Sequence, residues 1–322
     1  MPARDPRREA EALLAGDLTA RVLEPSPPAV RDGEWLADDP VGAPPGDPGL
    51  VVVAPVPLPA ARTWSAWVEE HPGRAAWAAE RWLAGARTIG PAPEGLAATR
   101  DGLHRLAVYV VSPARRRENG KIGLRWTLGG FGTPCFGSDR QVRVEGARLV
   151  VDGRGGGGAA PITTLTEAAA LALGGPPDLA WAEGMDVPGP GDPDAPLGVD
   201  EEAATWLGRL YGFGTSLLEE ARHHPDSATP GASRVQLWPE HFDVAVDVTG
   251  THGGTVTLGL SPGDAAIPEP YLYVLPHDAP VTGDPFWNAD AFPGAIAPVA
   301  AVGEDRAAAL SFLLAGVERG RP

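Results

Sequence analysis

The sequence is poor in cysteine, in lysine and in long apolar runs. Cys135 is the single cysteine, so an internal disulfide and a cysteine-rich zinc site are excluded. No apolar stretch approaches the roughly 18 residues that a transmembrane helix needs. The first residues are charged and lack the apolar core of a signal peptide, so we expect a cytoplasmic protein without a membrane partner.

Positive charge is also scarce. The chain has 26 Lys and Arg residues against 42 Asp and Glu, which gives a formal net charge of −16 at pH 7. Because such an acidic surface repels phosphate backbones, we predict no nucleic-acid partner. Apolar residues make up 43% of the chain, which is enough for a globular core. The 42 glycines and 36 prolines predict many turns and long loops.

Breaks rich in proline and glycine predict four regions along the chain. Residues 1–95 combine a short charged helix, a Pro-rich acidic stretch and tryptophans at helical spacing. Residues 176–199 are typical of a Pro- and Gly-rich linker. The first α+β unit is predicted at 96–175, and a second unit that ends in a helix is predicted at 200–322.

Apolar periodicity predicts the main elements of both units. Three segments have the period of a helix, and the first should end before Pro113: 101–111, 200–222 and 305–319. The predicted strands, most of which alternate, are 121–128, 141–145, 148–151, 235–237, 242–248, 255–260 and 271–275. Two of them, 141–145 and 148–151, form a hairpin over Glu145-Gly146. Helix followed by strands occurs twice, which predicts an internal duplication.

Strict alternation indicates a sheet with one buried face. We therefore predict an α+β fold in which an antiparallel sheet is covered by helices on one face. If the strands pair into one sheet, its other face gathers a set of polar side chains: Lys121, Arg125, Thr127, Arg143, His241, Asp243, Asp247, Thr255 and Thr257. This polar face is either a binding cleft or a solvated surface.

Two cations on this face have the spacing of an anion site. Lys121 and Arg125 lie four residues apart, which is about 13 Å along a strand. Their side chains can hold a carboxylate or a phosphate. They can equally pair with Asp243 and Asp247 across the sheet.

Glu240, His241 and Asp243 are the candidate catalytic residues. In an extended chain, His241 and Asp243 project to the same side. With His277 or Asp264, they could ligate a metal or form a base with its orienting carboxylate. A hydrogen-bonded histidine at a strand edge is the alternative. No metal-binding motif is present, so no metal ligand is predicted and the cofactor is unknown.

The segment Gly259-Leu260-Ser261-Pro262-Gly263 fits the G-x-S-x-G pattern of a nucleophile elbow. In that motif the residue after the serine donates its backbone N–H to the oxyanion hole. Pro262 has no N–H, so we predict a turn between strands here instead.

Several segments together resemble a family of proteins from high-GC bacteria that is known only as a domain of unknown function. The resemblance spans roughly residues 96–318 and implies a shared fold but no activity. It rests on these segments: Leu103-His104, Gly120-Lys121-Ile122, Phe242-Asp243-Val244-Ala245-Val246, Ser261-Pro262-Gly263-Asp264 and Pro270-Tyr271-Leu272-Tyr273-Val274 with Pro276.

We expect the polar face to bind a small polar or anionic metabolite. The candidate ligand-binding residues are Lys121, Arg125, Trp126, Trp238, Asp264, Tyr271, Tyr273 and His277. One alternative is a hydrolase, possibly metal-assisted, that uses Glu240, His241 and Asp243. The other is a non-catalytic interaction protein that uses the acidic Pro-rich loops. An enclosed cavity into which Lys121 and His241 converge would favour the first two over the third.

Overall fold

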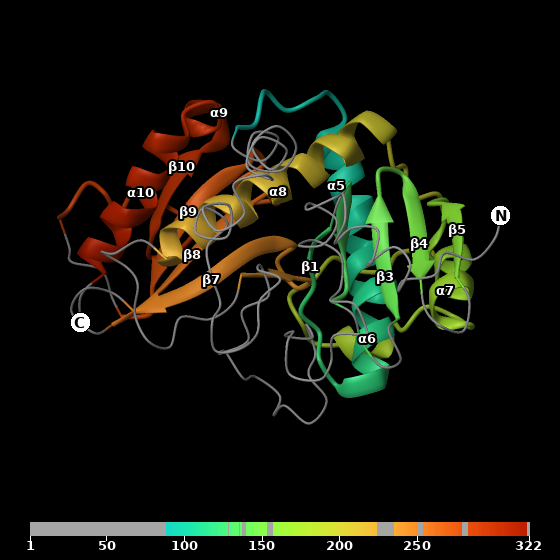
Figure 1. Ribbon diagram of the computed structural model, residues 1–322. Coiled ribbons are helices and arrows are strands. Elements are labelled where there is room, and N and C mark those ends of the chain that lie inside the picture. The colour runs from blue at the N-terminus through green and yellow to red at the C-terminus, as the bar shows by residue number, and fades with distance from the viewer. Residues whose placement is uncertain are drawn as a thin grey trace, which may run out of the picture.

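The computed structural model describes residues 88–320, apart from 128, 135, 137–139, 153–156, 224–234, 250–253 and 279–282. The helix, the Pro-rich stretch and the tryptophans predicted within residues 1–87 lie outside these residues. The described part is an α+β fold with two antiparallel sheets of five strands each (Figure 1). The predicted fold class is therefore confirmed. The prediction that both units share a single polar surface is wrong, because the strands form two sheets.

Each sheet is a meander in which every strand pairs with its neighbour in the sequence. Sheet I consists of β1 (Arg125–Thr127), β2 (Gly130–Gly132), β3 (Gln141–Glu145), β4 (Arg148–Asp152) and β5 (Gly158–Pro161). Sheet II consists of β6 (Gln236–Trp238), β7 (Asp243–Thr249), β8 (Thr255–Ser261), β9 (Tyr271–Pro276) and β10 (Ala295–Pro298). One isolated bridge, between Leu124 and Leu237, joins the chain segments beside β1 and β6.

The helices fall before, between and after the sheets. They are α5 (Leu96–Leu106), the π-helical turn η4 (Ala107–Val111), α6 (Ser112–Asn119), α7 (Leu165–Leu173), the 3₁₀ turn η5 (Ala180–Ala182), α8 (Glu201–His223), α9 (Val299–Val302) and α10 (Arg306–Arg319). Each sheet follows a helix, as the predicted duplication requires. The duplication itself stays a prediction, because it depends on how the two units superpose.

Most of the predicted elements are confirmed. The hairpin of β3 and β4 turns at Gly146, which has a φ of 56°. Two helices begin where a carboxylate caps them: Asp200 accepts from the N–H of Ala203 at 2.9 Å, and Asp305 accepts from that of Ala308 at 3.0 Å. Such caps satisfy donors that the first turn leaves unpaired. Seven elements were not predicted: β2, β5, β10, α6, α7, η5 and α9.

The predicted helix end before Pro113 is wrong. The chain stays helical from α5 through η4 into α6, and Pro113 lies in the first turn of α6. Proline disrupts a helix because it lacks an N–H and its ring crowds the preceding turn. The π-helical turn directly before Pro113 widens the helix at this point, which explains how the helix continues.

Helix α8 contacts strands of both sheets, and Figure 1 shows it crossing the molecule between them. Three glycines allow these close contacts. A Cβ on Gly208 would lie 2.8 Å from the backbone of Gly130, and one on Gly212 would lie 2.6 Å from the ring of Trp126. One on Gly214 would lie 2.8 Å from Val244 in sheet II.

The two faces of sheet II differ as its alternation predicts. The apolar face is buried against helices, because Val244 and Leu260 contact α8 while Val274 lies against Gly316 of α10. The strand register gives the opposite face a polar set of residues: Trp238, Asp243, Asp247, Thr257, Ser261, Tyr271 and Tyr273.

Sheet I does not keep an open polar face. Thr127, Gln141 and Arg143 are each 1% exposed or less. The prediction that Thr127 and Arg143 belong to the same open surface as Asp243 is therefore wrong. Among the described residues, no helix combines the length and the apolar character needed to cross a membrane.

Candidate functional site

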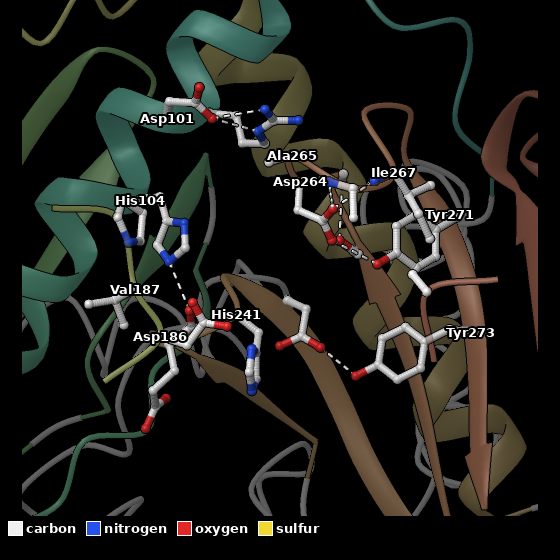
Figure 2. A pocket seen from close by; sticks show the side chains of 18 of the residues that line it. Asp101, His104, Asp186, Val187, His241, Asp264, Ala265, Ile267, Tyr271 and Tyr273 are labelled. Carbon is white, nitrogen blue, oxygen red and sulfur yellow. Dashed lines mark hydrogen bonds and ion pairs between the residues drawn. The ribbon is translucent and has the colours of Figure 1, made fainter. Parts of the chain in front are cut away.

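A cavity of about 790 Å³ lies beside the polar face of sheet II. This volume is within the range of small-molecule sites. Its walls come from α5, the segment 186–188, the turn before β7, the loop after β8, strand β9 and residues 291–292. Figure 2 shows Asp101 and His104 on one side of it and Tyr271 and Tyr273 on the other.

The structure brings six of the eleven predicted site residues to this cavity. They are Glu240, His241, Asp243, Asp264, Tyr271 and Tyr273. Five others do not line it: Lys121, Arg125, Trp126, Trp238 and His277.

The predicted cation pair lies with sheet I. Lys121 precedes β1, and Arg125 lies in it. Trp126, also in β1, packs against Gly212 of α8 and is buried. Because a single bridge is all that connects the described residues of this region to β6, the polar residues of the two units do not form one continuous sheet face.

Trp238 and His277 share the polar face of sheet II but not the cavity. Trp238 pairs with Asp243 across β6 and β7. His277 follows β9 at the far end of the face, where its Nε2 lies 2.9 Å from the hydroxyl of Thr257 and 3.7 Å from Oδ1 of Asp247. Since both side chains of this ion pair are about half exposed, the contact is a surface contact of small energy.

Asp243 is the most unusual residue of the cavity. It is only 4% exposed, and its Oδ1 is buried without a hydrogen-bond partner among the described residues. Its Oδ2 accepts a hydrogen bond from the hydroxyl of Tyr273. Burial raises the pKa of Asp243 to about 6, although the bond from Tyr273 and the nearby His241 act in the opposite direction.

Tyr273 reaches Asp243 because the residue between them has no side chain. Gly259 pairs with Tyr273 on one side and with Ala245 on the other. A Cβ on Gly259 would collide with the ring and the hydroxyl of Tyr273, so the ring lies across this glycine. Burial also raises the pKa of Tyr273 well above its usual value, and the hydroxyl therefore stays a donor. Figure 2 shows this bond.

Residues 239–242 form a turn, not the extended strand that the pattern predicts at Phe242. Phe242 has a φ of 56°, which is uncommon for a residue with a side chain. The turn is held at both ends, because the N–H of Phe242 donates to the carbonyl of Trp238 and its own carbonyl accepts from the hydroxyl of Tyr211, each at 2.7 Å. It places Glu240, His241 and Asp243 at one wall of the cavity.

His104 supports this turn from α5. Its Nε2 lies 2.9 Å from the carbonyl of Pro239 and 3.2 Å from that of Glu240. Carbonyls only accept, so Nε2 must carry the proton. The ring stacks on Phe242 with centroids 4.9 Å apart. Burial lowers the pKa of His104 to about 4, which keeps the imidazole neutral at pH 7.

Asp264 holds the loop after β8. Its Oδ1 accepts from the N–H groups of Ala266 and Ile267 at 2.7 Å each, and its Oδ2 accepts from the hydroxyl of Tyr271 at 3.1 Å. Both oxygens of Asp264 are therefore occupied within the protein. The loop includes Gly263, whose φ is 89°.

The G-x-S-x-G segment forms the end of β8 and this loop, as the missing N–H of Pro262 predicts. Ser261 is 4% exposed, and its hydroxyl accepts from the N–H of Gly263 at 3.1 Å. No helix follows: β8 ends at Ser261, and the next element is β9. A nucleophile elbow, which requires a helix, is therefore absent from this segment.

Sequence reasoning missed the wall that α5 provides. Arg100 and Arg105 line the cavity and were not predicted. Arg100 is 7% exposed; its guanidinium contacts Asp101 at 2.9 Å and donates to the carbonyl of Pro268 at 3.2 Å. The spacing of Arg100 and His104 by four residues places both on one helix face, and this was the available signal.

The predicted linker at 176–199 is packed against the helix. Trp181 donates its Nε1–H to the carbonyl of Val108 at 2.8 Å, and Tyr109 donates its hydroxyl to the carbonyl of Pro188 at 2.7 Å. These bonds hold Asp186, Val187 and Pro188 at the cavity. No sequence pattern indicated this role.

The described residues contain no group of three or more His, Cys, Asp or Glu side chains placed to hold a metal ion. The resemblance to a family stays a prediction, and four of the five segments on which it rests contribute residues to the cavity: His104, Asp243, Ser261, Gly263, Asp264, Tyr271 and Tyr273. Comparison of the chain with models of known families, with curated proteins and with solved structures finds no match.

Proposed function

We propose that this protein binds a small polar molecule in the cavity beside sheet II. The observation that carries the proposal is Asp243, which lines the cavity and whose Oδ1 is buried without a partner among the described residues. A buried carboxylate oxygen without a donor is energetically costly. A ligand that donates a hydrogen bond to Oδ1 removes this cost.

The charges of the wall favour a polar ligand over an anionic one. Five carboxylates line the cavity, against the two guanidinium groups of Arg100 and Arg105. Arg100 already pairs with Asp101. The anionic metabolite that Lys121 and Arg125 suggested has no support at this cavity, because neither residue lines it.

A thermal-shift screen of the full chain against small polar metabolites tests the proposal. We expect at least one compound to raise the melting temperature of the wild type. The same compound should raise that of Asp243→Asn much less, because the amide cannot accept in the same way at both positions. The melting temperature of each variant without ligand serves as its own reference.

Asp247→Asn is the matched control for this screen. Asp247 lies on the same strand and the same face as Asp243, but it is about half exposed and does not line the cavity. Its ligand response should equal that of the wild type. A screen without any stabilising compound, or a response that both substitutions reduce equally, contradicts the proposal.

Acid–base catalysis on the bound molecule is the second candidate function. The observation that favours it is the pKa of Asp243, raised to about 6 by burial, since a catalytic acid or base works best near the ambient pH. In this second candidate function Asp243 transfers the proton. The carboxylate of Asp243 and the substrate are positioned by Tyr273, Glu240 and His241. This is the hydrolase predicted from the sequence, without a metal.

Turnover assays with the compounds from the screen separate the two candidates. A hydrolase should convert a bound ester, amide or glycoside at a rate that changes near pH 6 and falls at least about a hundredfold in Asp243→Asn. Binding without any turnover, for every compound that stabilises the protein, would leave binding alone as the function.

A further inference from the structure

Two acidic residues in the wall of the cavity each have one carboxylate oxygen without a hydrogen-bond donor among the described residues. These oxygens are Oδ1 of Asp243 and Oε2 of Glu240, and both are buried. Glu240 belongs to the turn that leads into β7, Asp243 is the first residue of β7, and both residues line the cavity. Since no described residue donates to these two oxygens, a molecule in the cavity can supply the missing donors.

The wall of the cavity has an excess of negative charge, because five carboxylates line it together with the two guanidinium groups of Arg100 and Arg105. The guanidinium of Arg100 is occupied by Asp101 and by the carbonyl of Pro268. Asp264 adds a further carboxylate, although backbone N–H groups and Tyr271 satisfy its oxygens. A neutral ligand could supply hydrogen bonds but would leave the charge in place.

Aromatic rings face the same space. Tyr273 makes an edge contact with Phe292, with ring centroids 6.1 Å apart, and its ring centroid lies 6.2 Å from that of Tyr271. All three residues line the cavity. Aromatic faces attract cations, and organic cations are often held between carboxylates and such rings.

From this arrangement we infer that the ligand carries a positively charged nitrogen, as an ammonium or guanidinium group, held by Asp243 and Glu240. The inference rests on the proposed binding function and specifies its ligand class. The N–H groups of the cation donate to Oδ1 of Asp243 and to Oε2 of Glu240. The rest of the ligand packs against Tyr271, Tyr273 and Phe292. A metal ion alone would leave these aromatic walls unused.

The binding of a cation must be coupled to the proton of Asp243. The titratable and charged groups around this carboxyl come from several elements: Glu240 and His241 on the preceding turn, Asp264 on the loop after β8, Tyr271 and Tyr273 on β9, Tyr211 on α8, and Arg100, Asp101, His104 and Arg105 on α5. A cation binds the ionised carboxylate, so its affinity should increase with pH and level off above about 6. A neutral ligand that accepts a hydrogen bond from the protonated acid would show the opposite trend.

Two matched series of small probes test the inference with the full chain. The first is tyramine, tyrosol and 4-hydroxyphenylacetate; the second is butylammonium, butan-1-ol and butyrate. Within each series only the charge of one terminal group changes. By ligand-observed NMR at pH 8, we expect the ammonium compound to bind about tenfold more tightly than the alcohol, and the carboxylate to show no binding.

Variants and pH complete the experiment. Asp243→Asn and Glu240→Gln should each remove most of the preference for the ammonium compound, whereas Asp247→Asn should not. Lowering the pH from 6 to 5 should weaken tyramine binding about fivefold in the wild type, because the ionised fraction of Asp243 falls from about one half to about one tenth. Circular dichroism shows whether each variant is folded, and Glu240→Gln provides the second test if Asp243→Asn is not.

Three results would overturn the inference. An alcohol that binds as tightly as its ammonium analogue shows that the charge of the ligand is not recognised. A carboxylate that binds best shows that the site prefers a negatively charged ligand. An equal response to Mg²⁺ alone shows a metal site instead. If neutral compounds from the metabolite screen bind in an Asp243-dependent way while no cation does, the inference fails and the proposed function stands. If nothing binds, both fail.

Discussion

The two sheets bury charge in different ways. In sheet I, Arg143 is 1% exposed, and its guanidinium bonds to Glu145 at 2.8 Å and to Gln141 at 3.1 Å. In sheet II, Asp243 is 4% exposed, and one of its two oxygens has no partner among the described residues. The first charge is compensated within the protein, whereas the second is only partly compensated.

This difference separates a structural group from a functional one. A buried charge with partners is costly to remove, because its partners lose their bonds. A buried charge without a partner lowers the stability of the folded state, and such groups are concentrated at sites that bind or react. The free energy of unfolding should therefore respond in opposite directions when the two charges are removed.

The largest effect is expected for Arg143→Ala. The substitution removes one partner from Glu145 and one from Gln141 and opens a cavity, so we expect the free energy of unfolding to decrease by about 3–5 kcal/mol. Urea unfolding followed by circular dichroism measures it. Arg148→Ala, at an exposed position of β4, should change it by less than about 0.5 kcal/mol. Equal effects of the two substitutions would show that Arg143 is not a structural group.

The next effect concerns the pH dependence of the free energy of unfolding, to which two residues of the cavity beside sheet II contribute. The pKa of His104 falls from 6.5 to about 4 on folding, so the unfolded chain binds the proton more tightly. Stability therefore decreases as the pH falls from 6.5 to 4. The pKa of Asp243 rises from 3.8 to about 6, so here the folded chain binds the proton more tightly, and stability decreases as the pH rises from 3.8 to 6.

Each of these effects amounts to about 3 kcal/mol, at about 1.4 kcal/mol per pH unit, and in the wild type the two largely cancel. As the pH rises from 4 to 6.5, the free energy of unfolding of Asp243→Asn should increase by up to about 3 kcal/mol relative to that of the wild type. That of His104→Gln should decrease by a similar amount over the same range. Urea unfolding at a series of pH values measures both. Parallel curves for the three proteins would contradict the prediction.

A smaller effect is expected for Tyr273→Phe. The hydroxyl of Tyr273 lowers the pKa of Asp243 by donating to Oδ2, and the substitution removes this donor. The pKa of Asp243 should then rise by about one further pH unit. A titration followed by NMR of the carboxyl carbon measures it. A lower or unchanged pKa would show that the hydrogen bond does not form in solution.

No effect on the cavity is expected for Lys121→Met. Lys121 precedes β1 and does not line the cavity, so the ligand response in the thermal-shift screen should equal that of the wild type. A reduced response would mean that the two sheets act on one ligand, as the sequence pattern predicts. This substitution therefore distinguishes directly between the site of the sequence prediction and the site of the structure.

The sequence predicts the local structure of sheet II well. Alternation in β7 and β8 determines which side chains face α8 and which face the cavity, and it correctly places Asp243 on the polar face. The contact of Tyr273 with Asp243 was not predictable, because it depends on the register of β9 against β8. The length of the loop between these strands, which contains Asp264, does not determine that register.

The division into two sheets could not be predicted for a similar reason. Periodicity describes each strand by itself, and nothing in the run that contains Lys121 and Arg125 indicates which strands it pairs with. The close packing of α8 determines this division into two sheets. Gly208 and Gly212 allow β1 and β2 to pack closely on one side of the helix, and Gly214 allows sheet II to pack on the other side. Glycines within a helix were the overlooked signal.

The π-helical turn η4 (Ala107–Val111) holds one residue more than a regular helical turn. A chain that lacked one residue there would therefore form an ordinary α-helical turn, and Arg100 and His104 would keep their direction. A deletion of Leu106, in the regular part of the helix, would instead rotate both residues by about 100° relative to α6. The same one-residue deletion would thus be tolerated in η4 but would dismantle one wall of the cavity in α5.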